Sequence, residues 1–220
     1  KYAAKDYDKA MEYYQKISTT YSNAPLAYAA MNRMAMCYNV QGKAAEEIKA
    51  LEDYIKKLEK KDSPGFALIG AKNRLAYAYM RQGGKNVPAA VNRFIEVIKS
   101  LSDEKNPYVK TPEEREAAQQ ILCSAIYYKS QGYATLTKPE DKLADYRRLA
   151  IEGFTTVAQK YPKSSYAPGA LSQVATIYTM LGDPDKAQNA LDQLKRQFPD
   201  SAEDKNAQFL LALTLLKLGR

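Results

Sequence analysis

The sequence predicts an all-α fold in which helical hairpins stack as a solenoid. Apolar residues recur at helical spacing through almost the whole chain, as in segment 48–58, and no stretch shows a convincing strand alternation. A related phrase returns between helical segments, at 21–27, at 161–168 and at 198–202. Glycines then follow successive helical runs. A pattern that repeats at fixed offsets indicates a stacked helical array rather than a single-core enzyme domain.

Five glycines, each expected to end the first helix of a repeat, mark the positions of the repeats: Gly42, Gly83, Gly132, Gly182 and Gly219. Seven residues before each glycine stands an alanine, and four residues before each of the first four stands a tyrosine. A second helix follows with alanine and, four residues later, an aromatic residue or leucine; Glu47 with Leu51 is the weaker copy. A small residue on one helix lets its neighbour approach closely, and a large residue fills the remaining space.

The predicted helix starts carry capping chemistry. Thr111–Glu114 is a capping box with proline at the first helical position. Asp62–Pro64 and Asp183–Pro184 place a capping side chain before a proline. The glycines named above stand where a helix end favours a left-handed residue. We therefore expect a helix to end at each of them.

This pattern resembles the tetratricopeptide repeat family, and the resemblance covers essentially the whole chain. Segment 6–16 is close to the family's second helix. The step from second-helix alanine to first-helix alanine is 25 residues at Ala10–Ala35, Ala150–Ala175 and Ala187–Ala212. That step exceeds by about three residues the spacing in a repeat of about 34 residues. The lengthened Tyr/Phe-Pro-x-Ser link is similar to bacterial envelope members, the outer-membrane assembly lipoprotein and the Tol–Pal-associated division coordinator.

The resemblance implies a right-handed α–α superhelix of about five helical-hairpin repeats. We expect one solenoid over residues 1–220, a fragment of a longer chain that is incomplete at both ends. The approximate units are 1–24, 25–62, 63–106, 107–163, 164–200 and 201–220. The sequence departs from the family pattern in having no tryptophan, and in longer segments after Gly83, at 99–112 and at 133–143.

The composition and charge of the chain limit the classes of function that it can have. The net charge is +8, but 33 basic and 25 acidic residues are mixed along the chain, which disfavours a nucleic-acid partner. The densest basic stretch, 56–61, closes a helical pattern, where cations favour the helix C-terminus. No run is apolar and long enough to span a bilayer. Cys37 and Cys123 are expected to be small buried side chains, with a disulfide between them left open.

The sequence offers no catalytic constellation. It contains no histidine, which removes histidine acid–base catalysis, histidine-activated nucleophiles and histidine metal ligands. Gly83–Lys85 lacks the rest of a phosphate-binding loop and has no strand before it. Glu46–Glu47 and Glu113–Glu114 are neighbours that do not face each other on a helix. We expect no enzyme activity, cofactor or metal site.

The resemblance implies a partner-binding groove lined by first helices. Carried over residue by residue, it comprises Asn32, Arg33, Met36 and Asn39 from one repeat and Asn73, Arg74, Tyr77, Met80 and Arg81 from the next. Asparagine can bond a peptide backbone, and arginine can hold a carboxylate. The groove would bind a peptide or protein of acidic character. The alternative is that the recurring Asn-Arg pair is two solvated positions inherited by duplicated repeats. A later repeat offers Ser172, Gln173, Thr176 and Thr179, which are less distinctive.

The function expected from these observations is a non-catalytic protein–protein interaction scaffold. The alternative is a structural or oligomerisation spacer, in which the apolar helix Phe209–Leu218 docks further repeats or a second copy. A third hypothesis, an anionic-surface binder, would use the basic excess. By resemblance alone the location is periplasmic or outer-membrane-associated in a bacterium, with the cytoplasm as the alternative.

Overall fold

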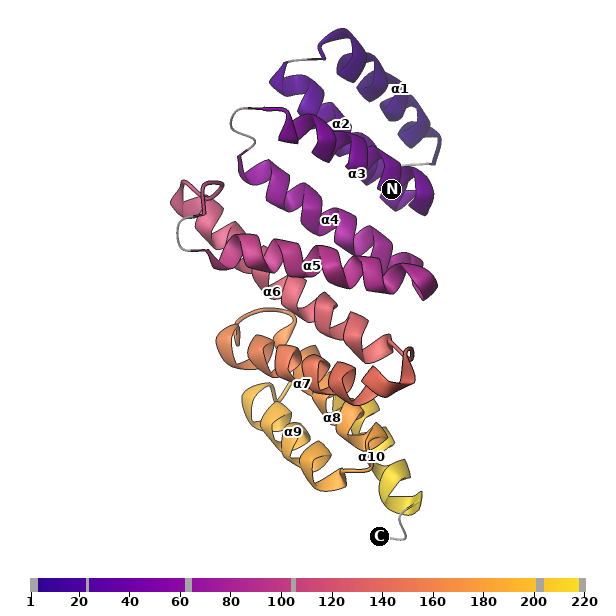
Figure 1. The fold of residues 1–220 in the computed structure, drawn as a ribbon, viewed down its shortest axis with the longest axis vertical. Coiled ribbons are helices and arrows are strands. Elements are labelled where there is room, and N and C mark those ends of the chain that lie inside the picture. The colour runs from indigo at the N-terminus through magenta and orange to yellow at the C-terminus, as the bar shows by residue number, and fades with distance from the viewer. Residues whose placement is uncertain (1–3, 23, 62–64, 104–105, 201–203, 218–220) are drawn as a thin grey trace. The chain divides into compact units, whose positions relative to one another are not determined.

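A computed structural model describes residues 4–22, 24–61, 65–103, 106–200 and 204–217. The described residues form ten α-helices and two short 3-10 helices, with no strand among them (Figure 1). The α-helices are α1 (Ala4–Thr20), α2 (Pro25–Val40), α3 (Ala44–Glu59), α4 (Phe66–Gln82), α5 (Val87–Ser102), α6 (Pro112–Thr135), α7 (Leu143–Lys160), α8 (Ala167–Met180), α9 (Pro184–Gln197) and α10 (Asp204–Lys217). The 3-10 helices are η1 (Gly84–Asn86) and η2 (Glu140–Lys142).

The chain divides into two compact units, 1–118 and 119–220, with the boundary inside α6. In the first unit, α1 to α5 pack in chain order, each on the next, as successive antiparallel helices (Figure 1). In the second unit, α7 packs on α8 and α8 on α9, while α10 packs on both α8 and α9. The predicted all-α repeat of helical hairpins is confirmed.

The core is built from the repeated small and large residues. The first-helix alanines Ala35, Ala76, Ala125 and Ala175 are fully buried. On the second helices, Phe94 and Phe154 are fully buried, each four residues after a fully buried alanine. Close helix approach at the alanine and filling by the aromatic ring therefore account for the pattern. Ala212 is the exception, because it is exposed on α10.

Three of the glycine helix ends are confirmed. Gly42, Gly83 and Gly182 have φ of 71°, 66° and 72°, the left-handed conformation that glycine adopts without a Cβ penalty. After Gly42 the Lys43 amide donates to the Tyr38 carbonyl at 2.9 Å, a bond that closes the last turn.

The prediction that a helix ends at Gly132 is wrong. The α6 helix continues through the buried Gly132 to Thr135, and the Thr135 hydroxyl donates to the Gly132 carbonyl at 2.9 Å. A buried glycine is tolerated inside a helix when neighbouring turns hold it in place. Gly219 lies outside the described residues.

The caps at two helix starts are confirmed. The Thr111 hydroxyl accepts from the Glu114 amide at 3.2 Å, and the Glu114 carboxylate accepts from the Thr111 amide at 3.1 Å, which completes the capping box of α6. The Asp183 carboxylate accepts from the Lys186 amide at 3.1 Å at the start of α9. Asp62–Pro64 lies outside the described residues.

Both cysteines are free and buried. Burial raises the pKa of the Cys37 thiol and of the Cys123 thiol, against the smaller effects of Arg33 on Cys37 and of the nearby Ser164 on Cys123. The two residues therefore act as small packing side chains.

Candidate partner-binding face

Two first helices of the first unit, α2 and α4, lie in a common register. Arg74 on α4 donates through Nη1 to Oδ1 of Asn32 on α2, 42 residues earlier in the chain. Nearer the ends of the same helices, Asn39 and Arg81 both bind Glu47 of α3. Two connections along α2 and α4, in the same order on both helices, show that these helices run parallel. Their equivalent residues form one surface, which we call the α2–α4 face.

Glu47 is the centre of a polar network beneath this face. Its side chain is 2% exposed. Oε1 accepts from Nδ2 of Asn39 at 2.8 Å, and Oε2 forms an ion pair with Arg81. A buried carboxylate is stable only when it is paired and hydrogen-bonded, and these partners satisfy both conditions.

Arg74 belongs to the same network. Burial lowers the pKa of its guanidinium, and the nearby Glu47 carboxylate and Tyr54 oppose that shift. Tyr54 is itself buried on α3, and burial raises the pKa of its hydroxyl. The guanidinium therefore lies between the helices, where it contributes positive charge while holding α2 against α4.

The predicted groove residues divide by exposure. Arg33, Met36 and Arg81 are exposed. Asn32, Asn39, Asn73, Arg74, Tyr77 and Met80 are half-buried. The Arg81 guanidinium lies 5.4 Å from the centre of the Tyr77 ring, within cation–π range. The structure therefore brings five of these residues together directly or through Glu47: Asn32, Asn39, Arg74, Tyr77 and Arg81.

Sequence reasoning missed Glu47, Leu26 and Val40 as parts of this region. Both lie on α2, where Leu26 is 56% exposed and Val40 is 62% exposed, compared with 42% for Met36. Their helical spacing from Arg33 and Met36 could have identified them. Glu47 could have been identified too, because it occupies the second-helix position where other repeats place alanine.

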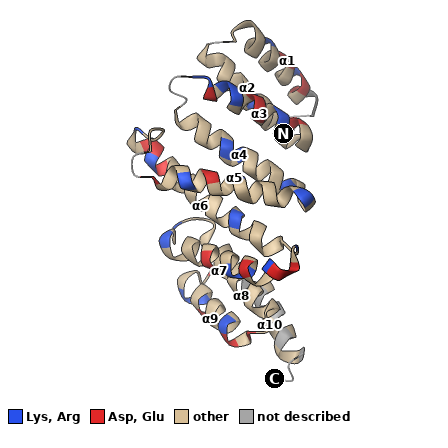
Figure 2. Ribbon diagram, in the orientation of Figure 1, with Lys and Arg blue, Asp and Glu red and all other residues tan. Residues whose placement is uncertain are grey.

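Charge on the α2–α4 face has one sign. Arg33 is the only charged residue of α2, and α4 contains Lys72, Arg74 and Arg81 without any acid (Figure 2). Lys72 pairs with Glu59 of α3 at 2.8 Å, so its charge is compensated. The guanidinium groups of Arg33, Arg74 and Arg81 outnumber the single carboxylate of Glu47, so the net charge of the face is positive.

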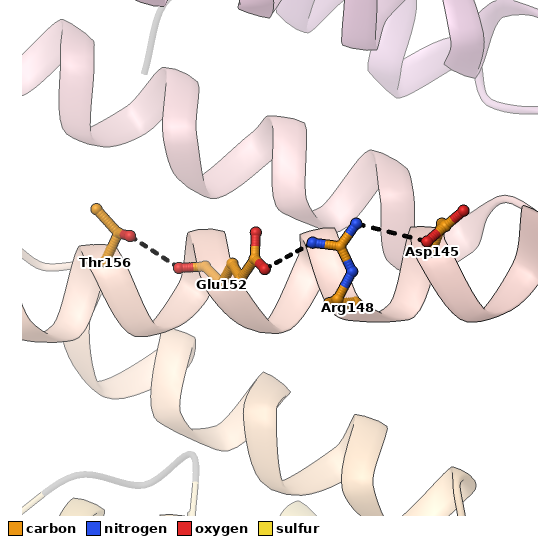
Figure 3. Close-up of polar contacts among 4 residues, drawn as sticks. All are labelled: Asp145, Arg148, Glu152 and Thr156. Carbon is orange, nitrogen blue, oxygen red and sulfur yellow. Dashed lines mark hydrogen bonds and ion pairs between the residues drawn. The ribbon is translucent and has the colours of Figure 1, made fainter.

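An arginine on α7 shows the opposite arrangement. Arg148 lies between Asp145 and Glu152 on the same helix and pairs with them at 3.4 and 2.8 Å (Figure 3). The Thr156 hydroxyl donates to the Glu152 carbonyl one turn further on (Figure 3). This cation is neutralised within its own helix, unlike Arg33.

A separate cleft of about 260 Å³ opens where α3, α4 and α5 meet. Its floor includes Ile55 and Leu75, and its walls carry acids and bases in equal number: Glu52, Glu59, Glu96, Lys56, Lys72 and Arg93. Arg93 lies 4.6 Å from the Tyr79 ring centre, and the Tyr79 hydroxyl donates to Glu52 at 2.9 Å. Lys72 pairs with Glu59 and Arg93 with Glu52, and the acids and bases balance in number, so this cleft favours neither anions nor cations.

The candidate residues of the second unit are less accessible. Ser172 and Thr179 of α8 are buried, at 7% and 8% exposure, and the Thr179 hydroxyl donates to the Ala175 carbonyl. Gln173 and Thr176 are half-buried. The α8 helix contains no charged residue.

Within the described ranges, no group of three or more His, Cys, Asp or Glu side chains is arranged to hold a metal ion. Across the same part of the chain, no helix has the length and apolar character required to span a membrane.

The sequence was compared with known protein families, and it matches the tetratricopeptide repeat. The tetratricopeptide repeat profile matches residues 170–201, which cover most of α8 and all of α9. This match supports a tetratricopeptide repeat assignment. None of the curated proteins compared with the chain matches its sequence.

Solved tetratricopeptide-like structures share the fold. BtubC (BKLC) from P. vanneervenii superposes with a TM-score of 0.64 at 12% identity, over 98% of this chain and 83% of that one. Nearly identical TPR-like repeats of a proposed kinesin light chain from Podosopora anserina give 0.57 at 19% identity, over 87% and 86%. A point variant of those repeats superposes with a TM-score of 0.57 at 20% identity, over 87% of this chain and 86% of that one. At these identities the likeness establishes the fold alone.

Proposed function

We propose that this protein is a non-catalytic interaction scaffold that binds a segment of a partner protein on the α2–α4 face. One observation carries the proposal: the face combines exposed apolar side chains with cationic side chains and no acid on either helix. Exposed Leu26, Met36 and Val40 supply apolar contact, and Arg33 and Arg81 supply charge. Apolar residues with arginine are the composition of protein-binding surfaces.

The fold supports this proposal, because tetratricopeptide-like repeats generally serve as protein-interaction scaffolds. The positive charge of the face favours a partner with acidic residues. The Glu47 network holds Arg74 and Arg81 in place before a partner arrives, which reduces the entropy lost on binding.

Site-specific photo-crosslinking tests the proposal. A photoreactive residue is placed at Met36 on α2 and, as the matched control, at Ile95 on α5, since these side chains are 42% and 40% exposed. In an extract of the source cells, we expect a protein adduct from position 36 that is absent from position 95 and is reduced by Arg33→Glu. Adducts of equal yield from both positions would contradict binding on this face.

A second candidate function is an oligomerisation or spacer module. Phe209 and Leu216 of α10 are 65% and 75% exposed, so apolar side chains remain uncovered on this helix. Docking of α10 on another copy would make the molecular mass rise with concentration. Analytical ultracentrifugation of the parent chain and of Leu216→Lys measures this, and a concentration-independent monomer mass for both would reject self-association.

We also propose a bacterial envelope location, supported by the Tyr/Phe-Pro-x-Ser links between repeats. These links begin at Tyr161, directly after α7, and at Phe198, directly after α9. Fractionation of the source cells, with the chain detected by antibody, tests it. Recovery with cytoplasmic markers would reject the proposal and leave the scaffold function standing.

A further inference from the structure

We propose that the partner segment bound by the α2–α4 face is an amphipathic helix with acidic flanks. This inference rests on the proposed function and names the chemical class of its partner. Four features of the face lead to it: the spacing of its exposed residues, the small residues among them, the state of its asparagines and the position of its charges.

The exposed residues of α2 follow a regular alternating spacing of three and four residues. After Pro25, which is exposed at the start of the helix, they are Leu26, Ala29, Arg33, Met36 and Val40. The residues of α4 at the equivalent places are Ala67, Gly70, Arg74, Tyr77 and Arg81. Alternation of three and four is the spacing at which one helix receives the side chains of another.

The first half of each helix also leaves room for a close neighbour. A Cβ added to Gly70 would meet no atom within 4 Å, so the space above the α4 backbone is open. Ala29 stands four residues before Arg33, as Gly70 stands four residues before Arg74. Ala29 is exposed, and its side chain is a single methyl group. Small residues next to larger apolar ones form depressions that a partner side chain can fill.

Two of the three asparagines that could bind an extended peptide, Asn32 and Asn39, are already engaged. An extended peptide needs external partners for its backbone N–H and C=O groups, and asparagine side chains are suited to that role. Here the Asn32 carbonyl accepts from Arg74 and the Asn39 amide donates to Glu47. A helical partner satisfies its backbone internally and needs no such bonds. The face therefore suits a helix better than an extended chain.

Two exposed cations, Arg33 and Arg81, belong to the rows of α2 and α4 that would contact a docked helix. Arg33 is exposed near the middle of α2, and Arg81 is exposed at the end of α4. Arg81 shares its guanidinium with buried Glu47 but keeps 31% of its side chain exposed. Glutamate or aspartate beside the apolar stripe of the partner would pair with these groups, whereas lysine there would be repelled.

Two displayed libraries of peptides of about 20 residues, roughly 30 Å long as helices, are suitable probes. The first has helix-forming residues with apolar positions at alternating spacing of three and four, and its other positions vary among Glu, Gln, Lys and Ala. The second has the same apolar content but a proline in every turn, which prevents helix formation. We expect the chain to enrich glutamate-rich members of the first library.

Variants then locate the binding. For an enriched peptide, we expect fluorescence anisotropy to show that Met36→Glu and Arg33→Glu each weaken binding about tenfold or more. The matched controls are Ile95→Glu on α5 and Lys49→Glu on α3, both at exposed positions, and they should change binding less than about twofold. Circular dichroism checks that all four variants keep the parent helix content.

The outcomes separate this inference from the proposed function. Enrichment of the proline library, with loss of binding in Met36→Glu, would reject a helical partner and keep the face as the binding site. Enrichment of lysine-rich helices would reject acidic flanks. No enrichment from either library, or binding that the α2 variants leave unchanged, would reject both the inference and the proposed site.

Discussion

Glu47 shows how one residue can alter the role of its neighbours. At the equivalent second-helix position, other repeats of this chain place alanine, such as Ala90 and Ala150, which are fully buried. A carboxylate at such a position cannot remain unpaired, and it attracts Asn39 and Arg81. The buried Glu47 carboxylate therefore orients Asn39 and Arg81, which also remain partly in contact with solvent.

We predict that Glu47→Gln lowers the free energy of unfolding by about 1.5–3 kcal/mol, because it removes the charge from a buried carboxylate that bonds Asn39 and Arg81. Glu46→Gln is the matched control, since Glu46 is exposed on the same turn, and it should change stability by less than about 0.5 kcal/mol. Urea unfolding followed by circular dichroism measures both. Equal effects of the two substitutions would mean that the Glu47 network contributes no stability.

We predict that Gly153→Ala is destabilising. A Cβ on Gly153 of α7 would lie 1.9 Å from Oγ and 3.2 Å from Cβ of Ser130 on α6, so the helices would have to separate. Overpacking of this kind costs about 1–3 kcal/mol. Addition of Ser130→Ala should recover part of the loss in thermal unfolding, because it removes the closer clash.

Gly70→Ala is the control for the glycine prediction. Gly70 is also inside a helix, but its added methyl group would meet nothing within 4 Å. Replacing a mid-helix glycine by alanine then stabilises the helix by about 0.5–1 kcal/mol. A loss of stability at position 70 as large as at position 153 would show that helix packing is not the cause.

At the scale of elements, the ends of the helices are fixed by short local signals. The α6 helix starts at a reciprocal capping box, and α9 starts at a carboxylate cap. The α2 and α8 helices end at left-handed glycines, Gly42 and Gly182. These signals act over a few residues and are therefore visible in the sequence.

We predict that Thr111→Ala destabilises the start of α6 by about 1 kcal/mol, because the Glu114 amide loses its acceptor. Thr137→Ala is the control, since Thr137 is exposed in the segment after α6. Hydrogen exchange of the first-turn amides should be faster only in Thr111→Ala. Unchanged exchange in that variant would mean that the box is not formed in solution.

We predict a pH-dependent contribution from the Asp183 cap. The Lys186 side chain and amide hold the pKa of this carboxyl below its ordinary value of 3.8. A lowered folded-state pKa means that the charge stabilises the fold above pH 3.8 and that this stabilisation disappears as the pH falls through the folded-state pKa. Asp183→Asn keeps a capping oxygen without the charge. The stability difference between parent and variant should be present at neutral pH and vanish in acid.

At the scale of the whole molecule, packing is local along the chain. Helices pack on their neighbours in sequence, and the residues divide into the units 1–118 and 119–220. In an array of this kind, stability is a sum of repeat and nearest-neighbour contributions. Damage to one repeat should therefore be felt most in the helices that contact it.

We predict that Phe94→Ala and Phe154→Ala have different local effects. Both rings are fully buried, so each truncation should cost about 3–5 kcal/mol. Hydrogen exchange followed by mass spectrometry should show lost protection in α4 and α5 for Phe94→Ala, and in α7 and α8 for Phe154→Ala. Equal loss of protection throughout the chain in both variants would show instead that the molecule unfolds as one cooperative unit.

The sequence alone determined the helical-hairpin repeat, the core alanines and aromatic rings, and most helix ends. These features depend on spacing and on short-range capping, which a single chain displays directly. It failed at Gly132, because a helix can continue through a glycine that tertiary packing holds in place.

Only the tertiary structure decided which polar residues are available to a partner. The repeated Asn-Arg pairs look equivalent in sequence, yet Arg33 is exposed and Arg74 bonds Asn32 beside buried Glu47. The physical reason is that burial and pairing depend on which side chains of three different helices meet. Spacing within one helix predicts the face on which a residue lies, but the neighbouring helices determine whether its hydrogen bonds and charge remain free.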